Sequence, residues 1–303
     1  MQNVPNLAAV LLFATCSWAQ PHIFSVFGAA DYANAGTVGI PQGSIFAITG
    51  VSLTTPTKYP VPPVIPTGPT LRTDVSGVSV GIRTLGNSKQ VIAQAPLLYV
   101  SSMQVNAILP SSVPVGQYEV YLTTLSSAGS AQAFDSNPLP ILVTGGRFAP
   151  FTRQGRGFGP AAIQEYDTAG TLTLNQFTAS ASPGSIMALY GTGLGALPTG
   201  SDASPPPIGT IRNDITVYVA GIPVKPLYAG RAPSLFGVDQ INFVLPTGME
   251  GCYVPVQVSR ARLKVPGSQF PFRFQGIPAQ ANSGYQQKLW LRWMRAAQSL
   301  QMS

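Results

Sequence analysis

The sequence contains an internal repeat, in which four short blocks of the first half of the chain recur in the same order in the second half. The blocks begin at Gly43, Ala95, Gln104 and Gly116 in the first copy and at Gly184, Ala232, Gln240 and Gly251 in the second. Self-similarity of this kind indicates a tandem duplication, so both halves are expected to adopt the same fold.

Ten positions carry the repeat motif: Gly43, Gly50, Gln104, Asn106 and Pro110 in the first copy, and Gly184, Gly191, Gln240, Asn242 and Pro246 in the second. The two glycines of each copy bound a short apolar run, and each Gln-x-Asn opens an alternating run that ends in Leu-Pro. Proline cannot donate to a sheet ladder and therefore marks a strand end. We expect structural roles here, as turn glycines and as amides that hydrogen-bond a neighbouring loop backbone; the alternative is ligand binding.

Short apolar or alternating runs, bounded by Gly and Pro, occur throughout both copies, for example at residues 44–49, 75–82 and 215–219. Runs of this length and period predict buried or half-buried β-strands. The 31 glycines and 29 prolines, with only 9% charged residues, suit short strands joined by turns. The sequence therefore predicts an all-β chain with two tandem immunoglobulin-like β-sandwich domains, at residues 24–150 and 158–262.

Three motifs of the second copy also point to a family: Pro-Gly-Ser-Ile at 183–186, Tyr-Gly-Thr-Gly-Leu-Gly at 190–195 and Gly-Val-Asp-Gln-Ile-Asn at 237–242. Over residues 24–258 the chain resembles the secreted immunoglobulin-like repeat family of Solibacter-type C-terminal domains, which is itself similar to IPT/TIG domains. The resemblance implies an exported sandwich and brings no established reaction, cofactor or catalytic residue. The family pattern ends after Val258, which leaves the last strand of the second sandwich open.

The N-terminus has the pattern of an export signal. Residues 7–14 form an apolar run that is too short to span a bilayer, and Ser17-Trp18-Ala19 is a small-x-small cleavage site. We predict a signal peptide over residues 1–19 and a secreted or cell-surface protein; the alternatives are a buried first strand and lipid modification at Cys16. Cleavage would remove Cys16 and leave Cys252 without a partner for an internal disulfide.

The net charge of +7 is concentrated at the end of the chain. All ten acidic residues lie at or before Glu250, and seven basic residues follow it: Arg260, Arg262, Lys264, Arg273, Lys288, Arg292 and Arg295. The other ten basic residues balance the ten acidic ones, and a neutral body is poorly suited to bind a phosphate backbone. We expect no nucleic-acid partner.

A basic tail at residues 263–303 is expected outside the sandwiches. Within it, residues 286–301 place Leu289, Trp293, Ala297 and Leu300 on one stripe of a helix, with basic residues on the other face. A basic amphipathic helix of this kind can make weak contact with an anionic membrane surface. The alternative is a non-native tail that follows a frame disruption.

The residue types that catalysis and metal binding require are sparse. The one histidine, His22, lies three residues after Ala19, where an ordered position is not expected, so no Ser-His-Asp triad is predicted. Glu165 and Asp167 suit turns, with calcium binding as the alternative. The glycines at 191–195 lack the following helix that a phosphate loop needs. We predict no catalytic, cofactor-binding or metal site.

These observations favour a secreted or cell-surface, non-enzymatic module that presents loops and sheet edges to a protein or a glycan. The alternatives are a structural spacer of a surface assembly and an accessory carbohydrate-binding fragment of a hydrolase. A coplanar row of exposed aromatic side chains would favour a glycan, and its absence would favour a spacer.

The predicted signal peptide is tested by N-terminal sequencing of the exported protein. The sequence should begin at Gln20, because Ser17 and Ala19 are the small residues that signal peptidase reads. An Ala19→Arg variant should accumulate as unprocessed precursor. Exported protein that retains Cys16 would contradict the prediction.

Overall fold

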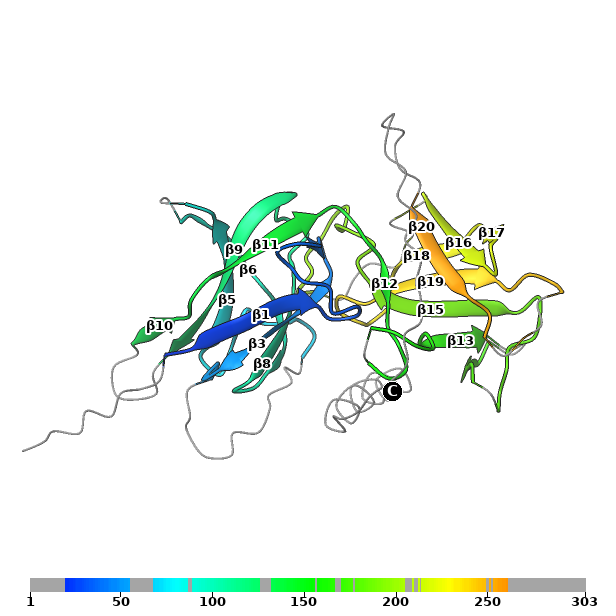
Figure 1. The fold of residues 1–303 in the computed structure, drawn as a ribbon, viewed down its shortest axis with the longest axis horizontal. Coiled ribbons are helices and arrows are strands. Elements are labelled where there is room, and N and C mark those ends of the chain that lie inside the picture. The colour runs from blue at the N-terminus through cyan, green and yellow to red at the C-terminus, as the bar shows by residue number, and fades with distance from the viewer. Residues whose placement is uncertain are drawn as a thin grey trace, which may run out of the picture.

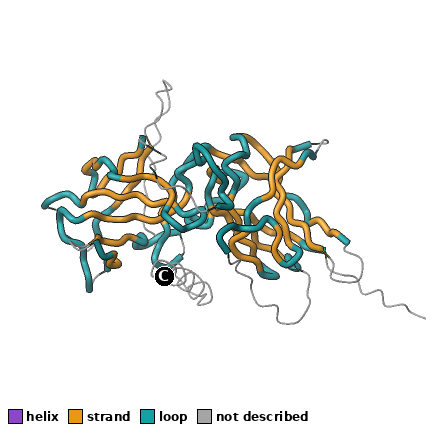
Figure 2. Tube along the Cα trace, turned by 180° about the vertical axis from the view of Figure 1, so that it is seen from behind, coloured by secondary structure: helices purple, strands orange, loops and turns teal. Residues whose placement is uncertain are grey.

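The computed structural model describes residues 20–54, 68–86, 89–125, 132–155, 157–166, 170–176, 178–204, 209, 212, 214–248, 251 and 253–260. In these residues every regular element is a β-strand, and no helix occurs among them (Figures 1 and 2). No helix long and apolar enough to cross a membrane is therefore found in the described residues. The predicted signal peptide, Cys252 and the predicted tail helix lie outside the described residues.

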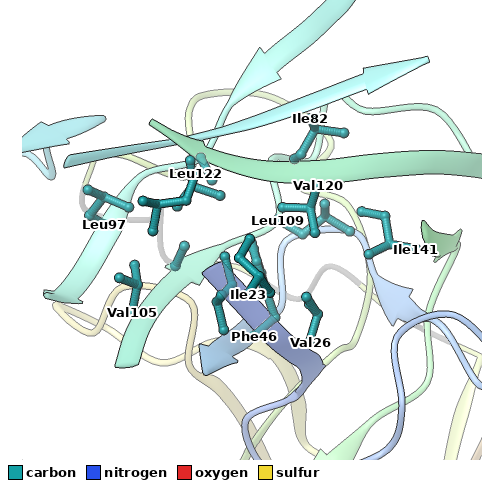
Figure 3. Packing of buried hydrophobic residues seen from close by; sticks show 14 of the residues in the cluster. Ile23, Val26, Phe46, Ile82, Leu97, Val105, Leu109, Val120, Leu122 and Ile141 are labelled. Carbon is teal, nitrogen blue, oxygen red and sulfur yellow. The ribbon is translucent and has the colours of Figure 1, made fainter. Parts of the chain in front are cut away.

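The N-terminal unit, residues 22–144, consists of two sheets around one apolar core (Figure 3). The first sheet has the order β1 (His22–Gly28), β3 (Ile45–Val51), β8 (Gln104–Ile108) and β7 (Leu97–Val100). The second has the order β2 (Ile40–Pro41), β11 (Leu139–Thr144), β9 (Gly116–Leu125), β5 (Val78–Thr84) and β4 (Asp74–Val75), with β6 (Val91–Gln94) beside β5 and β10 (Ala133–Asp135) beside β9. Both sheets contribute to the core, for example through Phe46 of β3 and Leu122 of β9.

The C-terminal unit, residues 149–260, also consists of two sheets around its own apolar core. The larger sheet has the order β14 (Leu172–Leu174), β13 (Ile163–Tyr166), β15 (Ile186–Thr192), β19 (Asp239–Val244) and β18 (Tyr228–Arg231), with β12 (Ala149–Pro150) beside β15. The smaller sheet has the order β17 (Ile222–Val224), β16 (Ile215–Val219) and β20 (Val256–Arg260). Figure 1 shows the two units end to end along the long axis of the molecule.

The duplication in the sequence is also a duplication of strand order and register. The order β1-β3-β8-β7 corresponds to β13-β15-β19-β18, and β6-β5-β9 corresponds to β17-β16-β20. In the central ladder Ala47 lies opposite Asn106, and the equivalent Ala188 lies opposite Asn242. The blocks led by Gly43 and Gln104 therefore specify the same pairing as those led by Gly184 and Gln240.

The Ala-Pro block of the sequence repeat is not structurally equivalent in the two units. Strand β7 follows the Ala95-Pro96 pair in the chain, whereas β18 precedes the matching Ala232-Pro233 pair. The two strands nevertheless occupy the same place beside β8 and β19. The difference places Arg231 at the last position of β18, where the C-terminal unit contacts the N-terminal unit.

The first motif glycine of each copy makes the turn that leads into the central strand. Gly43 and Gly184 have φ values of 70° and 88°, in the left-handed region that favours glycine. Each donates its N–H to the leucine of the Leu-Pro pair that ends the Gln-x-Asn run, Gly43 to Leu109 O at 2.7 Å and Gly184 to Leu245 O at 2.8 Å. In each unit one backbone hydrogen bond thus joins the motif glycine to the leucine of the Leu-Pro pair.

The second motif glycine of each copy allows a neighbouring strand to approach closely. A Cβ atom at Gly50 would overlap the carbonyl oxygen of His22 on β1, and one at Gly191 would overlap that of Ala149 on β12. Neither glycine has a left-handed φ value. Glycine is therefore needed at these positions because a Cβ atom would clash with the neighbouring strand, and not because of the backbone conformation.

Substitution of Gly50 by Ala should lower the free energy of unfolding by about 1–3 kcal/mol, because the added methyl group pushes against β1 backbone. Gly209→Ala is the matched control, since a Cβ atom there meets no described residue within 4 Å; its effect should stay within about 0.5 kcal/mol. Urea denaturation of both variants measures the difference. Equal stabilities would show that β1 can move away without loss.

Candidate functional site at the junction of the two units

The two units meet through a third apolar cluster, here called the junction cluster, to which each unit contributes five buried residues. They are Ala30, Ile45, Leu71, Leu98 and Ile108 from the N-terminal unit, and Ala149, Phe151, Ala162, Ala232 and Val238 from the C-terminal unit. The Ile45 side chain packs directly on the backbone of the other unit, because a Cβ atom at Gly237 would lie 2.7 Å from Ile45 Cγ1. Continuous apolar packing opposes the free movement that is usual between domains.

Arg231 lies buried beside this cluster, with 1% of its surface exposed. Its guanidinium forms an ion pair with Asp239, donates to Gly195 O at 2.9 Å, and lies 3.7 Å from Asp202 Oδ1. The turn of the N-terminal unit covers it, since a Cβ atom at Gly43 would overlap Nη2. A buried charge is tolerated only when it is paired and hydrogen-bonded. The burial of Arg231 therefore depends on Asp239, Gly195 and Asp202 together.

Asp202 connects this arginine to the N-terminal unit. Its two carboxylate oxygens accept hydrogen bonds from Ser111, from the backbone N at 2.6 Å and from Oγ at 2.9 Å. Ser111 Oγ in turn accepts from Leu197 N at 2.9 Å. Because Ser111 directly follows the motif residue Pro110, the turn after β8 is held by the Asp202 side chain and the Leu197 backbone of the other unit.

The glycine-rich loop at residues 191–195 surrounds the second carboxylate, that of Asp239. Leu194 N donates to Asp239 Oδ2 at 2.7 Å, while the flanking Gly193 and Gly195 have left-handed φ values of 105° and 114°. Burial raises the pKa of Asp239, while the charge of Arg231 and the backbone N–H groups of Leu194 and Gly193 act to lower it. The loop therefore does bind an anion, but the anion is a side chain of the same unit.

Further hydrogen bonds cross the junction. Thr192 Oγ1 accepts from Ile45 N at 3.0 Å and donates to Gly237 O at 2.7 Å. On another side of the junction, Leu71 N donates to Ala203 O at 2.7 Å. Backbone and side-chain bonds on several sides of the contact thus fix the angle between the units.

The amides of the repeat motif bond along their own strand. Gln104 Nε2 donates to Asn106 Oδ1 at 2.8 Å, and Gln240 Nε2 donates to Asn242 Oδ1 at 2.8 Å. The equal distances show that the repeat conserves side-chain geometry as well as backbone register. Of the motif glycines, Gly43 contacts the junction, whereas an added Cβ atom at the equivalent Gly184 has none of the described residues within 4 Å.

The other candidate residues have structural positions. Glu165 Oε1 accepts from Ser182 N at 3.1 Å and from Ser185 Oγ, and so holds the turn before β15; Asp167 lies outside the described residues. The expectation that His22 is unordered is wrong, because His22 is the first residue of β1 and its ring meets Phe24 edge-on. Within the described ranges, no group of three or more His, Cys, Asp or Glu could hold a metal ion.

Sequence reasoning missed the junction network. Asp239 occurs in one of the motifs that carry the family resemblance, but no pattern in the sequence connects it to Arg231, Asp202 or Ser111. The one available signal is compositional, since a charged residue inside the apolar Tyr-Ala-Gly-Arg-Ala-Pro stretch at 228–233 needs a partner when buried.

Comparison with known proteins shows no family: no family model matches the sequence, and no curated protein matches it. Among solved structures, the chain is similar to the full extracellular region of plexin A4, domains 1 to 8, at 13% sequence identity and a TM-score of 0.27. The match covers 86% of this chain and 20% of the plexin chain, so this chain spans about one fifth of that protein's length.

Arg231→Met should lower the free energy of unfolding by about 3–5 kcal/mol, because it leaves Asp239 buried without its cation. The double variant Arg231→Met with Asp239→Leu should recover part of the loss, since it removes both buried charges. Asp214→Asn is the surface control: its ion pair with Arg260 is exposed, so the loss should be below about 1 kcal/mol. Urea denaturation compares the three, and equal losses for Arg231→Met and Asp214→Asn would be the contrary result.

Proposed function

We propose that this chain is a secreted or cell-surface, non-enzymatic binding module made of two tandem immunoglobulin-like β-sandwiches, which contacts a partner through its loops and sheet edges. The export signal in the sequence, the family resemblance and the shared strand order of the two units support this proposal. The observation that carries it is the junction, where the buried Arg231 and Asp202 hold the units at one angle.

A fixed angle has a direct benefit for binding. Two units joined by a flexible linker lose orientational freedom when both contact the same partner, and that loss weakens affinity. Units that are already held in place avoid it. Buried charges contribute less to stability than apolar side chains of the same volume, so a charged junction is better explained by a specific geometry than by stability.

The surface favours a protein partner over a glycan. The edge strand β6 exposes apolar side chains, with Val91 49% and Ile92 36% exposed, and among the described residues it pairs with β5 alone. An edge strand with free backbone groups can add a strand of another protein. Among the described residues, by contrast, the exposed aromatic side chains share no strand: Phe24 lies on β1, and the others lie in loops, Tyr32, Phe158 and Tyr253.

A structural spacer is the second candidate, and the end-to-end arrangement of the units in Figure 1 favours it. A spacer needs a fixed length and a stiff junction but no ligand. The two candidates therefore differ in one measurable property, which is saturable binding to a partner.

Binding of the protein that begins at Gln20 should be measured on a glycan array and on cells of the producing organism, before and after protease treatment of the cell surface. We expect saturable binding to untreated cells, loss of binding after protease, and no array signal. The double variant Val91→Lys with Ile92→Lys should abolish the binding, because charges on an edge block strand addition.

Leu227→Lys is the matched control, an exposed apolar residue of the C-terminal unit whose substitution should leave the binding unchanged. Absence of binding in all assays would favour the spacer instead. An array signal that survives the β6 substitutions would identify a glycan ligand and contradict the protein partner.

A further inference from the structure

The smaller sheet of the C-terminal unit lacks one strand that its N-terminal counterpart has. In the N-terminal unit β9 lies between β5 and β11. The equivalent strand β20 pairs with β16, and in the described part of the chain no strand pairs with its other side. Since the units otherwise share their strand order, the comparison identifies a specific place for a missing strand.

The core beneath this place is only partly covered. Leu122 lies opposite the buried Val80 of β5, and Val258 lies opposite the equivalent Val217 of β16. Leu122 is 0% exposed, whereas Val258 and its neighbour Val256 are only half-buried and pack against the edge of the core. An apolar strand beside β20 would bury them as β11 helps to bury the core positions of β9.

The backbone of β20 shows which of its groups face this open side. Ala220 N donates to Pro255 O at 2.9 Å, so residue 255 directs its backbone groups toward β16. Backbone groups alternate along an antiparallel strand, hence Gln257 and Ser259 also face β16 and the N–H groups of Val256 and Val258 face away from it. The amides of Val256 and Val258 and those of Gln257 and Ser259 therefore lie on the same strand but face opposite sides of it.

We infer that residues 270–274 of this same chain form the missing strand. Their sequence, Phe-Pro-Phe-Arg-Phe, has the pattern of Leu-Pro-Ile-Leu-Val at 139–143 in β11, with proline second and large apolar residues first, third and fifth. In β11 Ile141 and Val143 are buried in the core. Phe270, Phe272 and Phe274 would take the equivalent inward positions, which extends the second sandwich beyond residue 262.

The proline is compatible with this pairing. In β11 Leu142 N donates to Ala35 O at 2.8 Å, so Leu142, and with it Pro140, directs its backbone groups away from β9. Pro271 would likewise face away from β20 and interrupt no ladder bond. The path is short as well, because only nine residues separate Arg260, the end of β20, from Phe270. An intramolecular strand at this distance outcompetes one from another molecule at ordinary concentrations.

Hydrogen exchange of the full chain beginning at Gln20, followed by NMR, tests the inference. The amides of Val256 and Val258 should be protected, and Phe272→Asp should speed their exchange by about 100-fold because the charged side chain would face the core. Arg273→Asp, which alters the neighbouring outward position, is the matched control and should change these rates less than about threefold. The amides of Gln257 and Ser259 should stay protected in both variants, which shows that the sheet remains folded.

Two results would overturn the inference. Exchange of Val256 and Val258 at the rate of exposed amides in the unsubstituted chain would show that nothing covers the edge. Protection of these amides that falls on dilution would show that the strand belongs to a second molecule.

Discussion

The arrangement of the two units depends on the burial of one guanidinium. Arg231 is enclosed by carboxylates and a carbonyl of its own unit and by the Gly43 turn of the other. Any rotation of one unit against the other would admit water to this charge or separate Asp202 from Ser111. Apolar packing alone tolerates small slides, whereas a buried ion pair with directional hydrogen bonds does not. The junction cluster supplies the contact area, and the charged network selects one orientation of it.

Within each unit the repeat motif acts on the backbone. Gly43 and Gly184 make left-handed turns whose N–H groups bond Leu109 and Leu245, and the next pair of glycines lets an outer strand approach. None of these roles involves an external ligand. The polar groups that bind an anion, at residues 193–194, are directed to the internal carboxylate of Asp239. The chemistry visible in the sequence is therefore largely used to complete the fold.

Much of the fold could be predicted from the sequence, because short alternating runs and turn glycines act locally and the repeat supplies each prediction twice. Both central strands, 44–49 and 185–190, fall within a residue or two of β3 and β15. The junction could not be predicted in this way. Ser111 and Asp202 are 91 residues apart, and their contact exists only once both units are folded and placed. The Ala-Pro match was misplaced, because β7 follows Ala95-Pro96 whereas β18 precedes Ala232-Pro233. The equivalent residues of the two strands are instead Tyr99 and Tyr228, which lie opposite Asn106 and Asn242.

The junction also joins unlike surfaces. The Gly43 turn of one unit meets the Arg231 end of the next, whereas no described residue lies within 4 Å of a Cβ atom added at the matching Gly184. Such a contact is heterologous, and repeated heterologous contacts form a closed ring or an open filament, depending on the rotation between successive units. A chain with a third copy, carrying an arginine at the equivalent of Arg231, could stack on the Gly184 turn by the same geometry and lengthen the molecule by one unit. Head-to-tail growth of this kind changes the length of a rod without requiring a new interface for each addition.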